Sequence, residues 1–242
     1  AKYEVFTDAA AARAYIEQEG APIVIKADGL AAGKGVIVAA TIEQALDAVD
    51  EIMCDKAFGS AGSRVVIEEC LIGEEASLLA FTDGETIVPM VSSQDHKRAY
   101  DKDEGPNTGG MGTYAPAPVI TKAVLDEVQK SVLEPTIRAM QVEGRKYVGC
   151  LYAGLMITAD GPKVIEFNAR FGDPETQVVL PLLESDLAEV MLACIDGKLG
   201  DIRVAWKDEA AVCVVMAAGG YPKAYKKGDV ITGTDAANQH GK

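Results

Sequence analysis

Alternating apolar and polar positions predict a strand from Val164 to Asn168, in the stretch VIEFNARFGDPETQ. Ile165 and Phe167 would leave one face of this strand and Glu166 and Asn168 the other, because successive side chains of a strand point to opposite faces. A carboxylate and an amide oxygen would then project side by side. Two such oxygens suit Mg²⁺, which keeps several waters and adds one or two carboxylates and phosphate oxygens. An ordinary edge strand with a polar outer face fits the pattern equally well.

The same reading predicts helices at five places, one of which is a run that starts at Pro174 and is interrupted by Pro181. Thr7 caps a helix that runs to Glu19, and Thr41 with Gln44 forms a capping box before an amphipathic helix. A helical pattern from residue 121 to 143 contains Pro135, which should kink or restart it. Ser185 caps a last helix that ends before Gly197. Strands are expected at residues 22–26, 36–40, 64–69, 76–81, 86–91, 149–158, 163–168 and 210–216.

A segment without periodicity runs from Ser92 to Pro118. Loops of this length inside a compact domain are usually functional or disordered. Its mixture of charged residues with the sequence GPNTGGMG is more typical of a substrate-binding loop than of a linker.

A glycine-rich stretch, ADGLAAGKG, lies between the first two strands that follow the N-terminal helix. Gly33 and Gly35 would let backbone N–H groups approach phosphate oxygens, while Lys34 and Lys26 would add positive charge. It is not a P-loop, because the spacing is one residue short, Gly35 stands where Ser or Thr should be, and a strand follows. A flexible glycine turn is the alternative.

Four acidic residues surround a turn in the stretch IEECLIGEEAS. Extended backbone near Glu68, Glu69 and Leu71 would offer the N–H and C=O that the edge of adenine needs, and a carboxylate, from Glu74 or Glu75, could bind both ribose hydroxyls. A solvated acidic face is the more common meaning of such a cluster taken alone.

Composition narrows the chemistry. The 242 residues carry a net charge of −14, which makes nucleic acid an unlikely partner. With only 2 histidines, a Ser-His-Asp hydrolase or a histidine-rich metal site is nearly excluded. The 5 scattered cysteines favour reduced thiols in the cytoplasm, and no stretch approaches the roughly 20 apolar residues of a membrane span.

Taken together, the segments IKADGLAAGKGV, IEECLIGEEAS, SQDHKR, GPNTGGMG, LYAGLM and IEFNARFGDPETQ resemble the ATP-grasp enzymes. Within them, GPNTGGMG and RFGDPETQ resemble the phosphoribosylamine–glycine ligase family of purine biosynthesis. The resemblance implies an α+β ATP-grasp fold, in which two α+β subdomains hold ATP between them. It implies a small subdomain at 1–78, a large one at 79–205 and the start of a C-terminal domain at 206–242. The family's N-terminal domain and most of its C-terminal domain would be absent.

The resemblance also implies roles for individual residues. Arg170 would stabilise the transferring phosphoryl group together with Lys34, and Glu166 and Asn168 would bind Mg²⁺ or Mn²⁺. The residues implied for ATP are Lys26, Lys34, Gly33, Gly35, Glu68, Glu69, Leu71 and Glu75. Those implied for glycine and the sugar phosphate are Asp95, Lys97, Asn107, Asp173 and Glu175.

The function implied is an ATP-dependent ligase that joins glycine to 5-phosphoribosylamine through a glycyl phosphate, with small-molecule substrates and neither nucleic acid nor membrane as partner. One alternative is a nucleotide-binding core without turnover. Another is an ATP-grasp ligase for a different acid or amine, which GPNTGGMG and RFGDPETQ disfavour.

Overall fold

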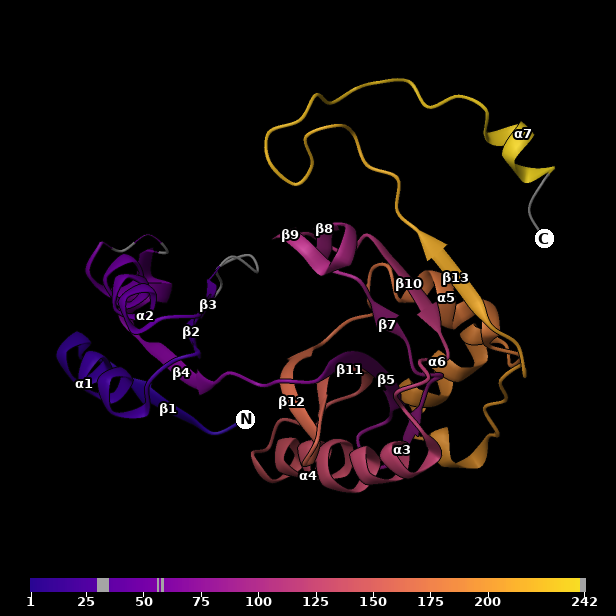
Figure 1. Ribbon diagram of the computed structural model, residues 1–242. Helices are drawn as coiled ribbons and strands as arrows, with labels where there is room; N and C mark the ends of the chain where they lie inside the picture. Colours follow the sequence, from indigo (N-terminus) through magenta and orange to yellow (C-terminus); the bar gives the residue numbers. More distant parts are fainter. Residues whose placement is uncertain (30–34, 56, 58, 240–242) are drawn as a thin grey trace. The chain divides into compact units, whose positions relative to one another are not determined.

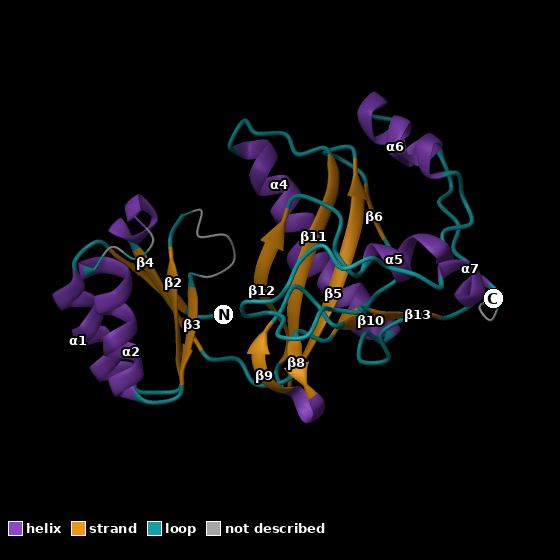
Figure 2. Ribbon diagram, turned by 90° about the horizontal axis from the view of Figure 1, so that it is seen from above, coloured by secondary structure: helices purple, strands orange, loops and turns teal. Residues whose placement is uncertain are grey.

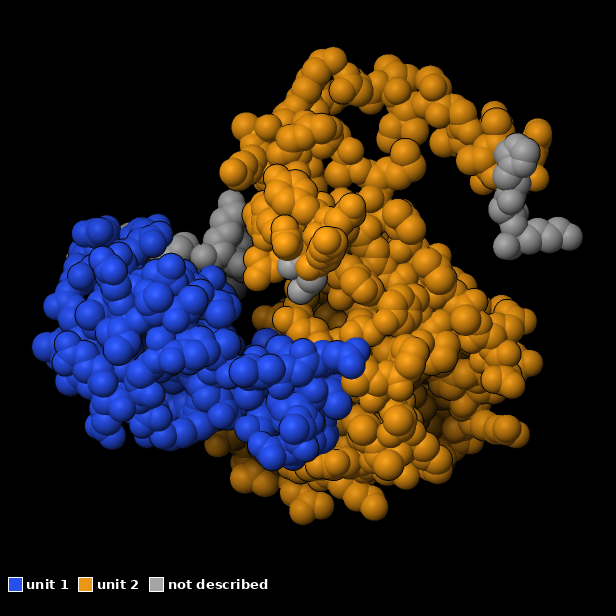
Figure 3. Space-filling model, in the orientation of Figure 1, with its two compact units in different colours: residues 1–74, 156–165 blue, residues 75–155, 166–242 orange. Residues whose placement is uncertain are grey.

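The computed structural model describes residues 1–29, 35–55, 57 and 59–239. Contacts within the chain divide it into two compact units (Figure 3). Unit 1 comprises residues 1–74 and 156–165, and unit 2 comprises residues 75–155 and 166–242. The three-part division predicted from the sequence stays a prediction.

Unit 1 is built on an antiparallel sheet with strand order β1-β4-β2-β3. Two helices, α1 (Ala9–Glu19) and α2 (Ile42–Val49), cover one face of it (Figures 1 and 2). The core between them contains Ile16, Ile25 and Ile67, each fully buried. The strands are β1 (Tyr3–Phe6), β2 (Ile23–Ala27), β3 (Val36–Ala39) and β4 (Val65–Glu69).

The helix starts in unit 1 follow side-chain capping. Thr41 Oγ1 accepts from Gln44 N at 3.2 Å, and Gln44 Oε1 accepts from Ala40 N at 2.9 Å. The predicted capping box is therefore confirmed, except that Gln44 bonds to the N–H of Ala40 and not to that of Thr41. The prediction of Thr7 as the first cap is wrong. Asp8 takes that position, and its Oδ1 accepts from Ala11 N at 2.8 Å. After α2 the chain continues through a π-helical segment, η1 (Asp50–Cys54), and a 3₁₀-helix, η2 (Gly59–Ser63).

A second four-stranded sheet has the order β12-β11-β5-β6. Its strands are β5 (Glu74–Thr82), β6 (Ile87–Pro89), β11 (Gly149–Thr158) and β12 (Gly161–Asn168). Figures 1 and 2 show a long helical run along one face, made of α3 (Lys122–Val128), the π-helical segment η4 (Gln129–Leu133) and α4 (Glu134–Val142). Pro135 lies in the first turn of α4, and the helical conformation continues through it without a break, so the chain changes from π-helix to α-helix here and does not restart.

The opposite face of this sheet packs on the C-terminal helices. Leu79, Phe81 and Tyr152 share a core with Val178 and Val190 there. β5 is buried from Ala76 to Thr82, as expected for a strand covered on both faces. The helical elements concerned are α5 (Thr176–Val179), η5 (Leu180–Leu182), α6 (Leu187–Asp196) and η6 (Leu199–Asp201).

The prediction of one long loop from Ser92 to Pro118 is wrong, because about half of this stretch forms short strands. These are β7 (Gln94–Asp95), β8 (Arg98–Tyr100), β9 (Glu104–Asn107) and β10 (Gly112–Ala115), with a 3₁₀ turn η3 (Asp101–Asp103). β10 pairs on one side with β7 and on the other with β13 (Ala211–Val214), and β8 pairs with β9. The strands, of two to four residues each, are too short to show a period of two.

A β-bulge lies where β6 leads into this segment. Ala80 pairs with Pro89, but Ser77 pairs with Ser93, so three steps along β5 match four along the other strand. Ser77 and Ser93 exchange two backbone hydrogen bonds, of 2.8 and 3.0 Å. Directly opposed residues of an antiparallel pair project from the same face. The bulge therefore brings Ser93 beside Ser77.

One more helix cap differs from the sequence prediction, and one short helix was not predicted. Asp186, not Ser185, caps α6, and its Oδ1 accepts from Ala188 N at 2.7 Å. A short helix, α7 (Thr234–Asn238), lies near the C-terminus. None of the helices in the described ranges is long and apolar enough to cross a membrane.

Candidate functional site

The sheet face of unit 1 opposite the helices carries a lysine–glutamate pair. In the β2–β4 ladder, buried Ile25 stands opposite buried Ile67, so Lys26 and Glu68 project from the other face. Lys26 Nζ lies 2.7 Å from Glu68 Oε2 and donates to the backbone oxygen of Ile165 at 3.0 Å. Each charged side chain is only 18% exposed, so this is a firmly held cation.

The neighbouring carboxylate, Glu69, is already bound within unit 1. Its Oε1 accepts from Lys2 N at 2.8 Å and lies 3.4 Å from Lys163 Nζ. The Lys2 N–H and the Lys163 charge hold the pKa of Glu69 below its usual range. Leu71 follows between β4 and β5, outside any strand, and is half-buried. The geometry therefore leaves backbone groups here, rather than the Glu69 carboxylate, available for a ligand.

The glycine-rich stretch lies mainly outside the described residues. The predicted phosphate-binding residues Gly33 and Lys34 are among those not described. Gly35 is described and buried, and its backbone oxygen accepts from Ala27 N at 2.8 Å, which continues the β2–β3 hairpin.

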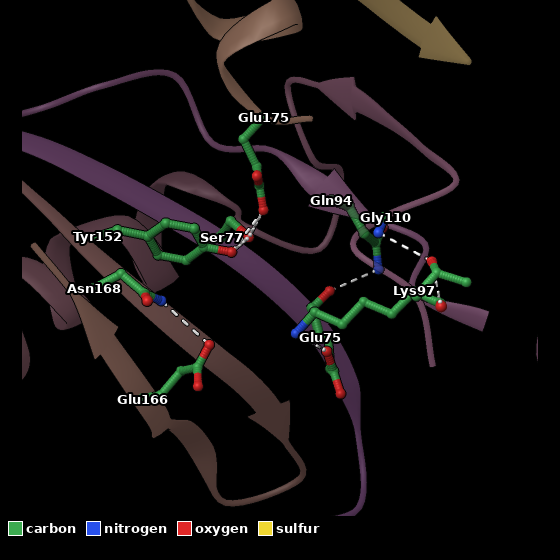
Figure 4. Close-up of polar contacts among 10 residues, drawn as sticks. Glu75, Ser77, Gln94, Lys97, Gly110, Tyr152, Glu166, Asn168 and Glu175 are labelled. Carbon is green, nitrogen blue, oxygen red and sulfur yellow. Dashed lines mark hydrogen bonds and ion pairs between the residues drawn. The ribbon is translucent and has the colours of Figure 1, made fainter. Parts of the chain in front are cut away.

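Glu166 and Asn168 lie side by side on β12, as the alternation predicted. Asn168 Nδ2 donates to Glu166 Oε1 at 3.2 Å (Figure 4). Glu166 is exposed and Asn168 half-buried, and Gly154 on β11 lets the Glu166 stem pack closely. Among the described residues there is no group of three or more His, Cys, Asp or Glu side chains that could hold a metal. A carboxylate and an amide oxygen at the solvent edge fit a cation that keeps most of its waters, such as Mg²⁺.

A buried hydroxyl–carboxylate network joins β5, β11 and the start of α5. Tyr152 Oη donates to Glu175 Oε1 at 2.6 Å, while Ser77 Oγ lies 2.7 Å from Tyr152 Oη and 3.1 Å from Glu175 Oε1 (Figure 4). Glu175 is only 2% exposed. Burial and the Glu175 charge raise the pKa of Tyr152, so its hydroxyl remains a donor at neutral pH.

Asp95 and Lys97 belong to the same region of unit 2. Burial, and then the charge of Glu175, raise the pKa of Asp95 to about 7. Lys97 Nζ lies 3.1 Å from Glu75 Oε2, while Gln94 Nε2 donates to the Glu75 backbone oxygen at 2.9 Å (Figure 4). Burial alone would lower the pKa of Lys97, but the Glu75 charge outweighs it and the pKa is raised. Four of the predicted residues, Glu75, Asp95, Lys97 and Glu175, are thus brought together.

Three other predicted residues are exposed. Arg170 Nη1 donates to the backbone oxygen of Phe171 at 2.8 Å, and Asp173 Oδ1 accepts from Gln177 Nε2 at 2.7 Å. Asn107 ends β9 opposite Arg98. Within the described ranges, no hydrogen bond or ion pair links these three side chains to the Glu175 network.

Comparison with known proteins identifies the family. Residues 1–176 match the family model described as phosphoribosylglycinamide synthetase, ATP-grasp (A) domain. The chain belongs to this family.

Relatives of the phosphoribosylglycinamide synthetase family agree. The chain is 59% identical over 234 residues to a phosphoribosylamine–glycine ligase of Vibrio vulnificus, covering 96% of this chain and 54% of that protein. A ligase of Neisseria meningitidis is 55% identical over 243 residues and is covered to 57%. The chain thus spans about half the length of these relatives.

A solved structure of the same family confirms the fold. The crystal structure of phosphoribosylamine–glycine ligase from Thermotoga maritima matches with a TM-score of 0.84 at 36% identity, covering 94% of this chain and 57% of that one. The predicted ATP-grasp fold is therefore confirmed.

Sequence reasoning missed the residues that bury the Glu175 carboxylate. Ser77 and Tyr152 sit within hydrophobic strands, where an isolated hydroxyl is unremarkable. Tyr221 was missed as well, although its Oη accepts from Gly109 N at 3.1 Å in the GPNTGGMG segment. Only the pairing of distant strands reveals these contacts.

Proposed function

We propose that this chain is the ATP-binding and substrate-binding core of an ATP-dependent ligase. The reaction joins glycine to 5-phosphoribosylamine through a glycyl phosphate and yields glycinamide ribonucleotide, ADP and phosphate. The observation that carries the proposal is the match to the family over residues 1–176, within which Glu166 and Asn168 lie together on one strand. The relatives named phosphoribosylamine–glycine ligase support the same reaction.

ATP would bind to the open sheet face of unit 1. Lys26 lies on this face, flanked by Val36 and Val38, which are 47% and 60% exposed. Aliphatic side chains of this kind suit the flat surface of a base, and the ammonium group suits phosphate. The adenine would contact Glu68, Glu69 and Leu71, with Leu71 acting through its backbone. The remaining ATP contacts proposed are the ribose on Glu75 and the phosphates on Gly33, Lys34 and Gly35.

Glu166 and Asn168 would hold Mg²⁺, or Mn²⁺ in its place. Both oxygens are hard ligands, and the exposed Glu166 leaves room for water and phosphate oxygens. The metal, when bound, would neutralise charge on the phosphates.

Phosphoryl transfer needs positioning and charge neutralisation, not a covalent protein nucleophile. Arg170, which is exposed, would contribute a guanidinium group toward the transferring phosphoryl group together with Lys34. Asp95, Lys97 and Glu175 would face the amino-acid and sugar-phosphate substrates. Asn107 and Asp173 would contribute at the edge of the same region.

The test is ADP release by the 242-residue chain given MgATP, glycine and freshly generated phosphoribosylamine. Release that requires both co-substrates is expected, and Glu166→Ala should abolish it. Glu143→Ala removes an exposed carboxylate at the end of α4 and serves as the matched control. Wild-type turnover in Glu166→Ala would refute the metal assignment.

A second candidate is nucleotide binding without turnover. It is favoured by the fact that the chain spans about half the length of its relatives. MgATP binding without ADP release in the same assay would support it over the complete ligase.

A further inference from the structure

The loop of residues 108–111, in the GPNTGGMG segment, has an acceptor for each of its four backbone N–H groups. Three of these acceptors are nearby in the sequence: Lys97 O for Thr108 N at 2.7 Å, Thr108 Oγ1 for Gly110 N at 3.0 Å, and His96 O for Met111 N at 2.8 Å. The fourth is distant. Gly109 N donates at 3.1 Å to the hydroxyl of Tyr221, 112 residues further along the chain.

The segment that follows β13 contacts this loop at two points. Val215 N donates to the backbone oxygen of Met111 at 2.9 Å, one residue beyond the β10–β13 pairing, and Tyr221 Oη accepts from Gly109 N. Between these points the segment turns back, with a bond of 3.1 Å from Tyr221 N to Ala218 O. We call residues 215–221 the strap. It holds the loop on both sides of Gly110.

The two glycines of the loop differ in what surrounds them. Gly110 is buried, and an added Cβ would lie 2.4 Å from Pro174 Cδ and 2.7 Å from Asp95 Oδ1. Gly109 is exposed. Beyond its chain neighbours, the only described atom within 4 Å of a Cβ there would be Tyr221 Oη, at 3.5 Å. Because glycine has wide conformational freedom, the conformation at Gly109 depends on this one contact.

The loop also fixes the backbone of Lys97. Thr108 donates twice to Lys97 O, from its N at 2.7 Å and from its Oγ1 at 2.8 Å, and the same Oγ1 accepts from Gly110 N (Figure 4). Lys97 carries the ammonium group that pairs with Glu75. A change in the loop at Gly109 would therefore reach Lys97 through a single threonine.

We propose that Tyr221 is a positioning residue, whose hydroxyl fixes the 108–111 loop and, through Thr108, the backbone of Lys97. The inference rests on the proposed function for the identity of the ligands, which are glycine and phosphoribosylamine. Tyr221 would support their binding without touching them. MgATP, whose proposed contacts lie mainly on unit 1, should bind equally well without the hydroxyl.

The surroundings of Tyr221 provide a clean substitution and a matched control. Its ring is half-buried and packs edge-on against Tyr225, with 5.6 Å between the ring centroids. Tyr221→Phe keeps this ring and removes only the oxygen that accepts from Gly109 N. Tyr225→Phe removes a hydroxyl from the same aromatic pair, and that hydroxyl has no hydrogen bond within the described ranges.

The first measurement is amide hydrogen exchange at Gly109 in the 242-residue chain. Tyr221→Phe should accelerate it about two- to tenfold, the factor that corresponds to the net free energy of one hydrogen bond. The second measurement is ADP release with MgATP, glycine and freshly generated phosphoribosylamine. In Tyr221→Phe the KM for glycine or for phosphoribosylamine should rise by about the same factor, while kcat and the KM for MgATP stay unchanged. Tyr225→Phe should alter none of these values.

Unchanged exchange at Gly109 in Tyr221→Phe would overturn the inference. Faster exchange with an unchanged KM for both co-substrates would overturn it as well, because Tyr221 would then have a structural role alone. Either result, in a wild-type chain that releases ADP, leaves the ligase proposal intact.

A wild-type chain that binds MgATP but releases no ADP would refute the ligase function. Calorimetric titration with glycine then decides on Tyr221. Weaker glycine binding by Tyr221→Phe than by the wild type and Tyr225→Phe would support the positioning role. Equal binding by all three chains, or no binding by any of them, would overturn it.

Discussion

The buried bond between Tyr152 and Glu175 allows the sharpest stability prediction. Tyr152→Phe removes one oxygen and keeps the ring, so the hydrophobic core is nearly unchanged. The lost bond is 2.6 Å long, and its donor and acceptor residues are 6% and 2% exposed. A hydrogen bond to a charged group contributes about 1.5–3 kcal/mol. Since Ser77 Oγ still reaches Glu175 at 3.1 Å, we expect a loss of about 2 kcal/mol in the free energy of unfolding.

The assay is urea unfolding at pH 7, followed by the fluorescence of Trp206. This is the only tryptophan, and it packs against the unit 2 core, so the signal reports on the unit that contains the network. An unchanged slope against urea would show that the midpoint shift reflects stability.

Tyr147→Phe is the matched control. Tyr147 Oη also donates at 2.6 Å, but to the neutral backbone oxygen of Cys150, and the residue is half-buried. Its loss should be about 1 kcal/mol. A smaller loss in Tyr152→Phe than in Tyr147→Phe would refute the view that a buried charge depends on this hydroxyl.

Three more outcomes are expected. Lys26→Met should destabilise unit 1 by about 1–3 kcal/mol, because it leaves Glu68 unpaired. Adding Glu68→Gln should recover most of that stability without restoring ATP binding. Chemical denaturation measures the first effect, and nucleotide titration measures the second. Gly110→Ala should lower the free energy of unfolding by on the order of 3 kcal/mol, because φ is +118° and the added Cβ would clash with its neighbours. Gly144→Ala, at φ +70° in open space, should lower it by only about 1 kcal/mol. Equal losses of stability in thermal unfolding would contradict the crowding at Gly110. The Asp95 pKa of about 7 lies above its unfolded value near 3.8, so the folded state holds this proton longer and stability should fall as pH rises from 4 to 7. In Asp95→Asn this pH-dependent loss of stability should be smaller by on the order of 2 kcal/mol, after allowance for solvent screening. Urea midpoints that depend on pH equally in the variant and the wild type between pH 4 and 8 would contradict the prediction.

Much of the fold could be predicted because its strands are hydrophobic and their turns carry strong signals. β11 has the predicted bounds, Gly149–Thr158, and the hairpin with β12 follows from Asp160-Gly161. The two misplaced caps have a local cause. Thr7 and Ser185 each precede an aspartate, and either residue type can cap a helix, so sequence alone does not decide between neighbours.

The candidate site could also be predicted only in part. The proximity of Glu166 and Asn168 was predictable, because both lie on one strand and its period of two places them on the same face. The network around Glu175 was not, because its members come from three distant segments that only tertiary pairing unites. That residues 156–165 belong to unit 1 could not be predicted either, because tertiary contacts and not chain order define the unit.

The bulge between β6 and β7 has a consequence for how such a chain can change over evolution. Deleting one residue between Pro89 and Ser93 would remove the bulge and still leave Ser93 opposite Ser77, with Asp95 two residues further on. A slip of the pairing by one residue, without any deletion, would instead place Ser92 opposite Ser77. Ser92 and Gln94 would then turn inward in place of Ser93 and Asp95, which exchanges an acidic side chain for a neutral one. We expect related chains to differ in the length of this short stretch more readily than in the register of its pairing with β5.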